Sequence, residues 1–226
     1  MIAVEARNVM KSIHGHQILN DVSFSANEGE RIGIIGQNGS GKSMLFKALS
    51  GLLLPDSGTI KVWGQAVGKN SFPSDFGCLI EHPGMLLQYS GMENLRLLAS
   101  IQKKCTAEDI SSLMLRLGLS PDDRRPVRKY SLGMRQKLGI IQAVMEKPKL
   151  VILDKPMNNL DAESIDIVRE LISEMQAAYG ITTIISSHNV EDCECQRKSE
   201  PSANQYLSHL CERILEPPTP KVTANT

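Results

Sequence analysis

The architecture of this chain can be worked out from one motif, Gly36-Gln37-Asn38-Gly39-Ser40-Gly41-Lys42-Ser43. A β-branched stretch at residues 31–35 leads directly into it, and apolar residues at helical spacing follow over residues 44–49. Glycines let the chain curl so that successive backbone N–H groups point at a phosphate, and the start of the next helix adds its positive end. Lys42 would bring a charge to the β- and γ-phosphates, and Ser43 a hydroxyl to Mg²⁺. The motif in this context predicts a nucleoside triphosphate site and disfavours a chance glycine-rich turn.

The flanking sequence predicts an α/β fold. Two short strands are expected at residues 4–9 and 18–24, joined by a turn, and another at residues 59–63. Later, apolar strands at residues 149–153 and 181–186 enclose an amphipathic helix at residues 162–178. Strands that alternate with helices indicate a mainly parallel sheet, preceded here by N-terminal antiparallel strands.

A helical insert is predicted at residues 86–135, where leucines and isoleucines recur at helical spacing. The strand–helix pattern continues to residue 192, so one domain is expected over residues 1–192. Residues 193–226 are different: 193–205 are polar and aperiodic, and 206–215 could form one short helix. Residues 216–226 are rich in Pro and Thr and are predicted to be disordered. The tail is therefore expected to be atypical or truncated.

Composition restricts the function classes. The chain has 226 residues, of which 41% are hydrophobic and 22% charged, and its formal net charge is zero, which disfavours nucleic acid as a partner. No secretory signal opens it and no apolar run reaches the 18 or so residues that cross a bilayer. The 5 scattered cysteines suggest free thiols in a reducing cytosol. Cys193 and Cys195 lack a second ligand pair, so metal binding there is disfavoured.

Further motifs follow the first in a fixed order. Ser131-Leu132-Gly133-Met134-Arg135-Gln136 precedes a helix, and the apolar strand that ends in Asp154 comes one helix later. Asn159-Leu160-Asp161 and His188 follow. Each alone has a structural explanation, since Ser131 could simply cap a helix and His188 could be a core histidine. Together they resemble the signature, Walker B, D-loop and switch histidine of ABC transporter ATP-binding subunits, over residues 2–192.

This resemblance implies a RecA-like P-loop core that works as a head-to-tail homo- or heterodimer of ATP-binding subunits. The phosphate loop of one subunit would bind ATP, and Ser131 and Gly133 of the other would close over it, with Asp161 at the same interface. Asp154 and Ser43 would hold Mg²⁺, and His188 would act in catalysis. Closure would drive an integral membrane permease, which implies a cytoplasmic protein peripheral to the inner face of the membrane.

Three positions depart from the family pattern. Lys155 follows Asp154 where the family has the glutamate that acts as general base. A lysine, with a pKa of about 10.4, is protonated at neutral pH and cannot accept a proton from water. Glu81 stands where a Q-loop glutamine is usual, and its carboxylate could still reach Mg²⁺. Ile13 takes the place of the aromatic residue that stacks on adenine, with His14 beside it.

Glu81 together with the form Ser131-Leu132-Gly133-Met134 is similar to the bacitracin and lantibiotic export and self-protection group, which implies transport of peptide antibiotics. Two alternatives remain. Lys155 favours an ATP-holding regulatory half of an asymmetric dimer, whose partner hydrolyses. A soluble ABC protein in translation or DNA repair is disfavoured, because those usually carry two ATP domains or long inserts.

Overall fold

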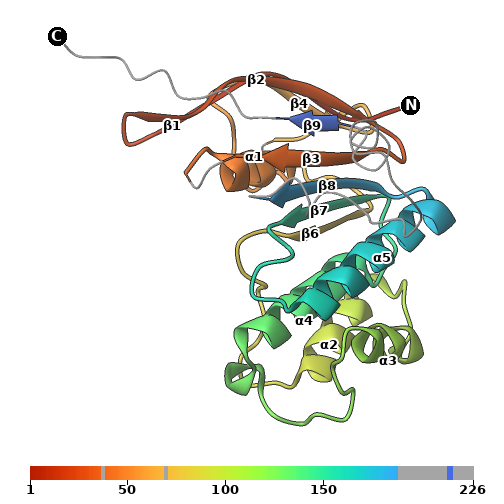
Figure 1. Ribbon diagram of the computed structural model, residues 1–226. Coiled ribbons are helices and arrows are strands. Elements are labelled where there is room, and N and C mark those ends of the chain that lie inside the picture. The colour runs from red at the N-terminus through yellow and green to blue at the C-terminus, as the bar shows by residue number, and fades with distance from the viewer. Residues whose placement is uncertain (37–38, 69–70, 188–212, 216–226) are drawn as a thin grey trace, which may run out of the picture.

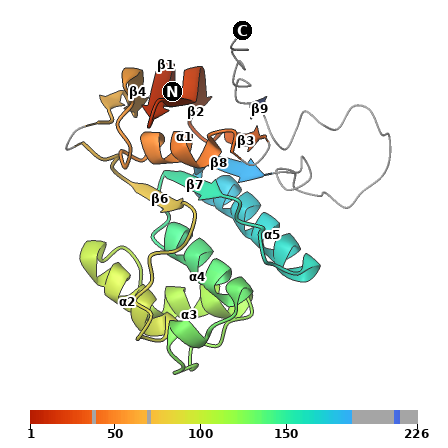
Figure 2. The ribbon, with the colours of Figure 1, turned by 90° about the vertical axis from the view of Figure 1, so that its left-hand side faces the viewer.

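The computed structural model describes residues 1–36, 39–68, 71–187 and 213–215, and its core is layered (Figure 1). An antiparallel sheet and a parallel sheet enclose helix α1 (Lys42–Leu49), and further helices cover the other face of the parallel sheet. Figure 2 shows the same layers from the side. The α/β class with N-terminal antiparallel strands and a mainly parallel sheet is confirmed.

The antiparallel sheet has the order β2-β1-β4-β5. Its strands are β1 (Ile2–Ile13), β2 (His16–Asn27), β4 (Ser57–Val62) and β5 (Gln65–Ala66). The first two are longer than expected because the hairpin turn needs only His14 and Gly15, with φ of 49° and 79°. Two positive φ values are typical of the primed turns that match the twist of a hairpin.

The parallel sheet has the order β6-β7-β8-β3-β9. It contains β3 (Arg31–Ile35), β6 (Phe76–Leu79), β7 (Leu150–Asp154), β8 (Thr182–Ser187) and β9 (Arg213–Leu215), and every neighbouring pair is parallel. Strand β6 had no clear sequence signal. Within it, a Cβ on Gly77 would lie 1.9 Å from the carbonyl oxygen of Ala143, so helix α4 packs directly on this backbone.

The expected insert is helical. It contains α2 (Gly91–Gln102), α3 (Ala107–Arg116) and a 3-10 turn at Val127–Lys129, followed by α4 (Leu132–Val144). Ser90 and Thr106 begin the first two helices with complete capping boxes. α4 and α5 (Ala162–Tyr179) pack under the parallel sheet and share one apolar core with the insert, whereas α1 and the antiparallel strands form a second core.

The expected helix over residues 206–215 is wrong at 213–215, which form β9 instead. This strand pairs with β3 at the edge of the parallel sheet, where backbone hydrogen bonding decides the conformation of three residues more than local periodicity does. The remainder of the tail, and the proposed boundary at residue 192, lie outside the described residues. Within those residues, no helix is both long and apolar enough to traverse a bilayer.

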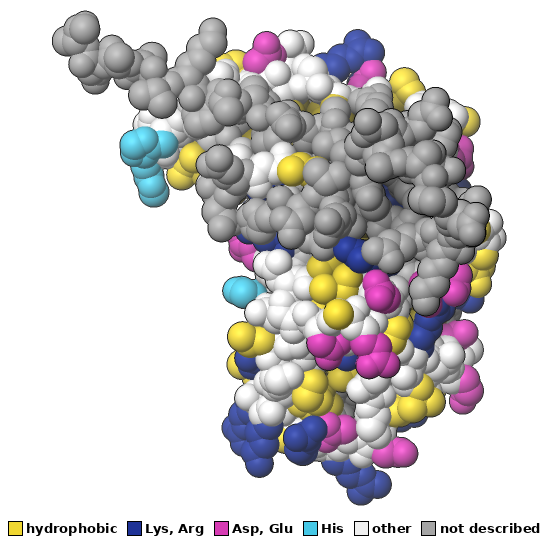
Figure 3. Space-filling model, in the orientation of Figure 1, with side chains coloured by type: hydrophobic (Ala, Val, Ile, Leu, Met, Phe, Trp, Pro, Cys, Tyr) yellow, Lys and Arg dark blue, Asp and Glu magenta, His cyan; other side chains and the backbone are white. Residues whose placement is uncertain are grey.

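Positive charge gathers at the far end of the insert, although the chain as a whole is neutral. Figure 3 shows dark blue side chains at the lower end of this face. The exposed cations of this region are Arg124, Arg125, Arg128 and Lys129. Arg125 is paired with Asp123 and lies over the Tyr130 ring, so part of this charge is used within the insert itself.

Candidate nucleotide-binding site

The glycine-rich loop joins the carboxyl end of β3 to the start of α1. Gly41 has φ of 90°, and a Cβ there would lie 2.7 Å from the carbonyl oxygen of Ile18. No side chain caps α1 and its first turn carries no acidic residue. The positive end of the helix is therefore left for an outside anion, as a phosphate site requires. Gln37 and Asn38 lie outside the described residues, and Gly36, Gly39 and Ser40 are in the loop.

Lys42 is buried and folds back over the loop. Its ammonium donates to the carbonyl oxygen of Gly36 and, at 3.3 Å, to the hydroxyl of Ser40. Burial lowers the pKa of Lys42, the nearby Lys155 lowers it further, and Asp154 opposes both. An ammonium group held by a carbonyl oxygen and a hydroxyl group can transfer these contacts to phosphate oxygens.

Asp154, at the end of β7, receives two short hydrogen bonds. Ser43 Oγ donates to Oδ2 at 2.5 Å, and Ser186 Oγ, from the end of β8, donates to Oδ1 at 2.5 Å. Asp154 is buried, so these hydroxyls replace water around its charge. A serine hydroxyl and a carboxylate oxygen that already meet form the hard oxygen pair that Mg²⁺ prefers, and the residues therefore fit this ion.

A cavity of about 230 Å³ opens beside this pair. Its lining brings together four of the predicted site residues, and the full set is Ser43, Glu81, His82, Gln136, Asp154, Lys155, Asn158 and Asn159. The carboxylate of Glu81 accepts a hydrogen bond from Lys47 Nζ at 2.7 Å, so an ion pair from α1 holds it at the cavity rim. Glu81 is thus placed to approach a metal ion bound at Ser43 and Asp154.

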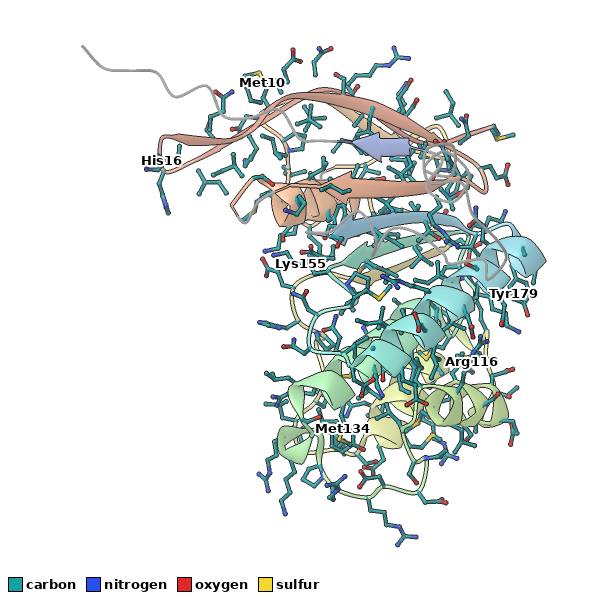
Figure 4. All side chains as sticks on the ribbon, in the orientation of Figure 1. Met10, His16, Arg116, Met134, Lys155 and Tyr179 are labelled. Carbon is teal, nitrogen blue, oxygen red and sulfur yellow. The ribbon has the colours of Figure 1, made fainter. Side chains whose placement is uncertain are left out.

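Lys155 follows Asp154 with φ of 51°, in the left-handed region. Its backbone N–H donates to Ser186, at 3.2 Å to the carbonyl oxygen and 3.0 Å to the hydroxyl. Figure 4 shows Lys155 on the side of the molecule where α1 begins, away from Arg116 and Tyr179. Lys155 lines the cavity, and its charge contributes to the lowered pKa of Lys42, so the two ammonium groups lie within electrostatic range of each other.

The residues of the first turn of α4 do not line this cavity, although Gln136 in the second turn does. Ser131 caps the helix by accepting the N–H of Met134 at 3.1 Å, and both Ser131 and Leu132 are exposed. A Cβ on Gly133 would lie 2.7 Å from the carbonyl oxygen of Asn159, so the first turn packs on the loop after β7. Asp161 caps α5 by accepting the N–H of Ser164 at 2.8 Å, and hydrogen bonds from the side chain and the backbone of Ser164 lower the pKa of Asp161. The structure leaves Ser131, Gly133 and Asp161 outside the subunit's own cavity.

The predicted adenine contact at Ile13 and the predicted switch histidine at His188 both stay predictions. Ile13 is half-buried at the end of the first hairpin, and the hairpin residue that lines a small cavity with Ser40 and Gly41 is Ile18. His188 lies outside the described residues. The contacts of Ser186 and Gln136 were not predicted from the sequence. For Ser186 a signal exists, because Ser186 and Ser187 stand at the carboxyl end of the strand that pairs with the strand of Asp154.

Comparison with known proteins shows which family this chain resembles. A family model described as ABC transporter matches residues 19–158. The ABC transporter ATP-binding protein YybJ of Bacillus subtilis is 38% identical over 84% of this chain and 87% of its own length. The lantibiotic transport ATP-binding protein SrtF of Streptococcus pyogenes is 35% identical over 84% and 82%. The bacitracin transport ATP-binding protein BcrA of Enterococcus faecalis is 33% identical over 93% of this chain but 68% of its own length.

A solved structure titled as the ATP binding subunit of an ABC transporter is 28% identical, with a TM-score of 0.74 over 84% of this chain and 80% of that one. A nucleotide-free ATP-binding cassette is 25% identical, with a TM-score of 0.70 over 84% and 83%. The chain belongs to the ABC transporter family and is an ATP-binding subunit of that family.

Proposed function

We propose that this subunit binds Mg-ATP between the glycine-rich loop and Asp154, and that closure against a second ATP-binding subunit drives a membrane permease. The observation that carries the proposal is that Lys42 and Ser43, at the start of α1, meet Asp154 at the carboxyl end of β7, although the two segments lie far apart in the sequence.

Each residue has a defined task in binding. The N–H groups at the start of α1 bind phosphate oxygens, and Lys42 exchanges the Gly36 carbonyl for the β- and γ-phosphates. Ser43 and Asp154 hold Mg²⁺, with Glu81 beside them, and Ser186 keeps the Asp154 carboxylate in place. The ion, when bound, neutralises phosphate charge and orients the γ-phosphate.

The second subunit completes the site. Ser131 directs the start of α4 outward, and neither Ser131 nor Gly133 lines the cavity of its own subunit. The exposed N-terminus of α4 carries the positive end of the helix dipole, which can bind the γ-phosphate of ATP held by the second subunit. The resulting head-to-tail dimer would pair two copies of this chain, or this chain with a related one, and Asp161 would lie near the same interface.

Lys155 separates binding from turnover in this proposal. A protonated lysine cannot take the proton of the attacking water, whereas its positive charge stabilises the triphosphate. We therefore infer strongly reduced hydrolysis at this site. This also makes the subunit a candidate for the regulatory half of an asymmetric dimer whose partner hydrolyses.

The transported substrate is proposed to be a peptide antibiotic, exported for self-protection or resistance. The support is the 33 to 35% identity to BcrA and SrtF, together with Glu81 and the residues 131–134. The permease would hold the subunit at the cytoplasmic face of the membrane. A soluble role in translation or DNA repair is the competing function, and the basic end of the insert is the feature that would serve it.

Calorimetric titration with Mg-ATP tests the binding proposal. The parent should bind, Lys42→Ala should lose affinity by more than tenfold, and the exposed Lys61→Ala on β4 should behave as the parent. Affinity purification of the chain from detergent-solubilised cells tests the partner. A polytopic membrane protein should be recovered, and ribosomes or DNA in its place would contradict the transporter assignment.

A further inference from the structure

Gln136 links α4, whose start faces the second subunit in the proposed function, to Lys155 in the nucleotide cavity. It lies in the second turn of α4, is buried, and lines the same cavity as Lys155. Its side-chain amide nitrogen donates to the carbonyl oxygen of Lys155 at 3.1 Å and to that of Pro156 at 3.0 Å. The amide nitrogen therefore has two backbone acceptors, which fix the orientation of the group.

The backbone of Lys155 is therefore held from two sides. Ser186 of β8 accepts its N–H, and Gln136 of α4 donates to its carbonyl oxygen. A non-glycine residue in the left-handed region needs such support, because that conformation costs on the order of 1 kcal/mol or more. The orientation of this backbone determines where the Lys155 side chain enters the cavity.

The contact also ties α4 to this loop. Gly133, one turn before Gln136, packs against the carbonyl oxygen of Asn159, so the first two turns of the helix lie on residues 155–159. A displacement of the start of α4 would pull on the Lys155 carbonyl through the Gln136 amide.

We propose that Gln136 is a positioning residue that holds the Lys155 ammonium at the γ-phosphate side of the cavity and transmits to it the position of the start of α4. This rests on the proposed function, since it assumes that nucleotide binds here. In this proposal Gln136 of α4 determines how strongly the site prefers a nucleoside triphosphate over a diphosphate. When the start of α4 contacts the nucleotide of the second subunit, the preference of the subunit that contains this α4 changes.

The test measures affinities for the non-hydrolysed analogue AMP-PNP and for ADP, both with Mg²⁺, in the parent, Gln136→Met, Lys155→Met and the double variant. Met matches the volume of Gln but donates no hydrogen bond. Gln136→Met should lower AMP-PNP affinity about fivefold and leave ADP affinity unchanged, and it should add nothing to Lys155→Met, because coupled neighbours are not additive. Gln142→Met, at a position on the same helix that does not line the cavity, is the control and should behave as the parent.

Gln136→Glu supplies a second measurement. Its carboxylate faces two carbonyl oxygens and cannot donate, so its AMP-PNP affinity should fall at least as far as that of Gln136→Met, again with no loss for ADP. Additive effects of Gln136→Met and Lys155→Met, or an equal loss for ADP, would overturn the role of Gln136. Failure of the parent itself to bind either nucleotide would instead overturn the proposed function.

Discussion

Ser43 and Asp154 are 111 positions apart in sequence, yet Ser43 Oγ donates to Asp154 Oδ2 at 2.5 Å. The contact joins the first turn of α1 to the carboxyl end of β7. It exists because β3 and β7 are parallel strands of one sheet, with β8 between them, so that their carboxyl ends reach the same edge. The fold therefore brings the two residues of the expected metal pair together.

Loss of this pair should weaken ATP binding only when Mg²⁺ is present. Ser43→Ala removes one oxygen of the pair, and the expected loss of affinity is about tenfold, as for a contact to a charged group. With excess EDTA the variant and the parent should bind equally. Ser50→Ala, which removes a hydroxyl at the other end of α1, is the control and should bind as the parent does. An equal loss with and without Mg²⁺ would argue against a metal role for Ser43.

Gly77→Ala should destabilise the fold by about 3 kcal/mol, because the new Cβ would overlap the Ala143 carbonyl oxygen and force α4 away from β6. Gly84→Ala is the matched control, since its Cβ would meet nothing within 4 Å. Urea unfolding of both variants measures the difference. Similar midpoints for the two would show that α4 can shift without cost.

Ser131→Ala removes the cap of α4 and should cost about 1 kcal/mol of stability. It should also weaken Mg-ATP-dependent association of two subunits, measured by sedimentation. Thr106→Ala removes an equivalent cap from α3, at a similar cost, and should leave association unchanged. If both variants associate like the parent, the start of α4 is not the contact that closes on nucleotide.

The ion pair between Arg116 and Glu174 should add a small pH-dependent stability. Arg116 donates to both carboxylate oxygens, at 2.6 and 2.8 Å, and these hydrogen bonds lower the pKa of Glu174. Because the pKa of Glu174 is lower in the folded than in the unfolded protein, the ion pair contributes its full stability at pH values above the unfolded pKa of about 4.3. This contribution is lost as the pH falls through the folded pKa.

Because Glu174 is 62% exposed, screening should keep this contribution below about 1 kcal/mol. Glu174→Gln should therefore be slightly less stable than the parent at pH 7 and equal to it near pH 2. Glu170→Gln, which alters a neighbouring charge on the same helix without breaking the pair, should show a smaller difference. Unfolding midpoints at the two pH values provide the measurement.

The sequence predicts the strand–loop–helix at residues 31–49 and the helices of the insert well, because those elements depend on local signals such as glycine position and Ser or Thr caps. Strands β6 and β9 depend on pairing with β7 and β3, which no local pattern encodes. The same limit applies to the site: Lys42, Ser43 and Asp154 belong to motifs, whereas the contacts of Ser186 and Gln136 with Asp154 and Lys155 appear only once the strands and α4 are assembled.

The proposed separation of ATP binding from ATP hydrolysis depends on Lys155. Lys155→Glu supplies a carboxylate next to Asp154, and a general base contributes on the order of 100-fold or more to a hydrolytic step. Lys155→Met removes the positive charge without supplying a base. It therefore shows whether a faster reaction in Lys155→Glu comes from loss of the charge or from the new carboxylate. The decisive measurement is single-turnover hydrolysis of Mg-ATP by the parent, Lys155→Met and Lys155→Glu. Hydrolysis should be slow in the parent and in Lys155→Met and about 100-fold faster in Lys155→Glu. Equal rates in the parent and Lys155→Glu would show that Lys155 does not limit hydrolysis.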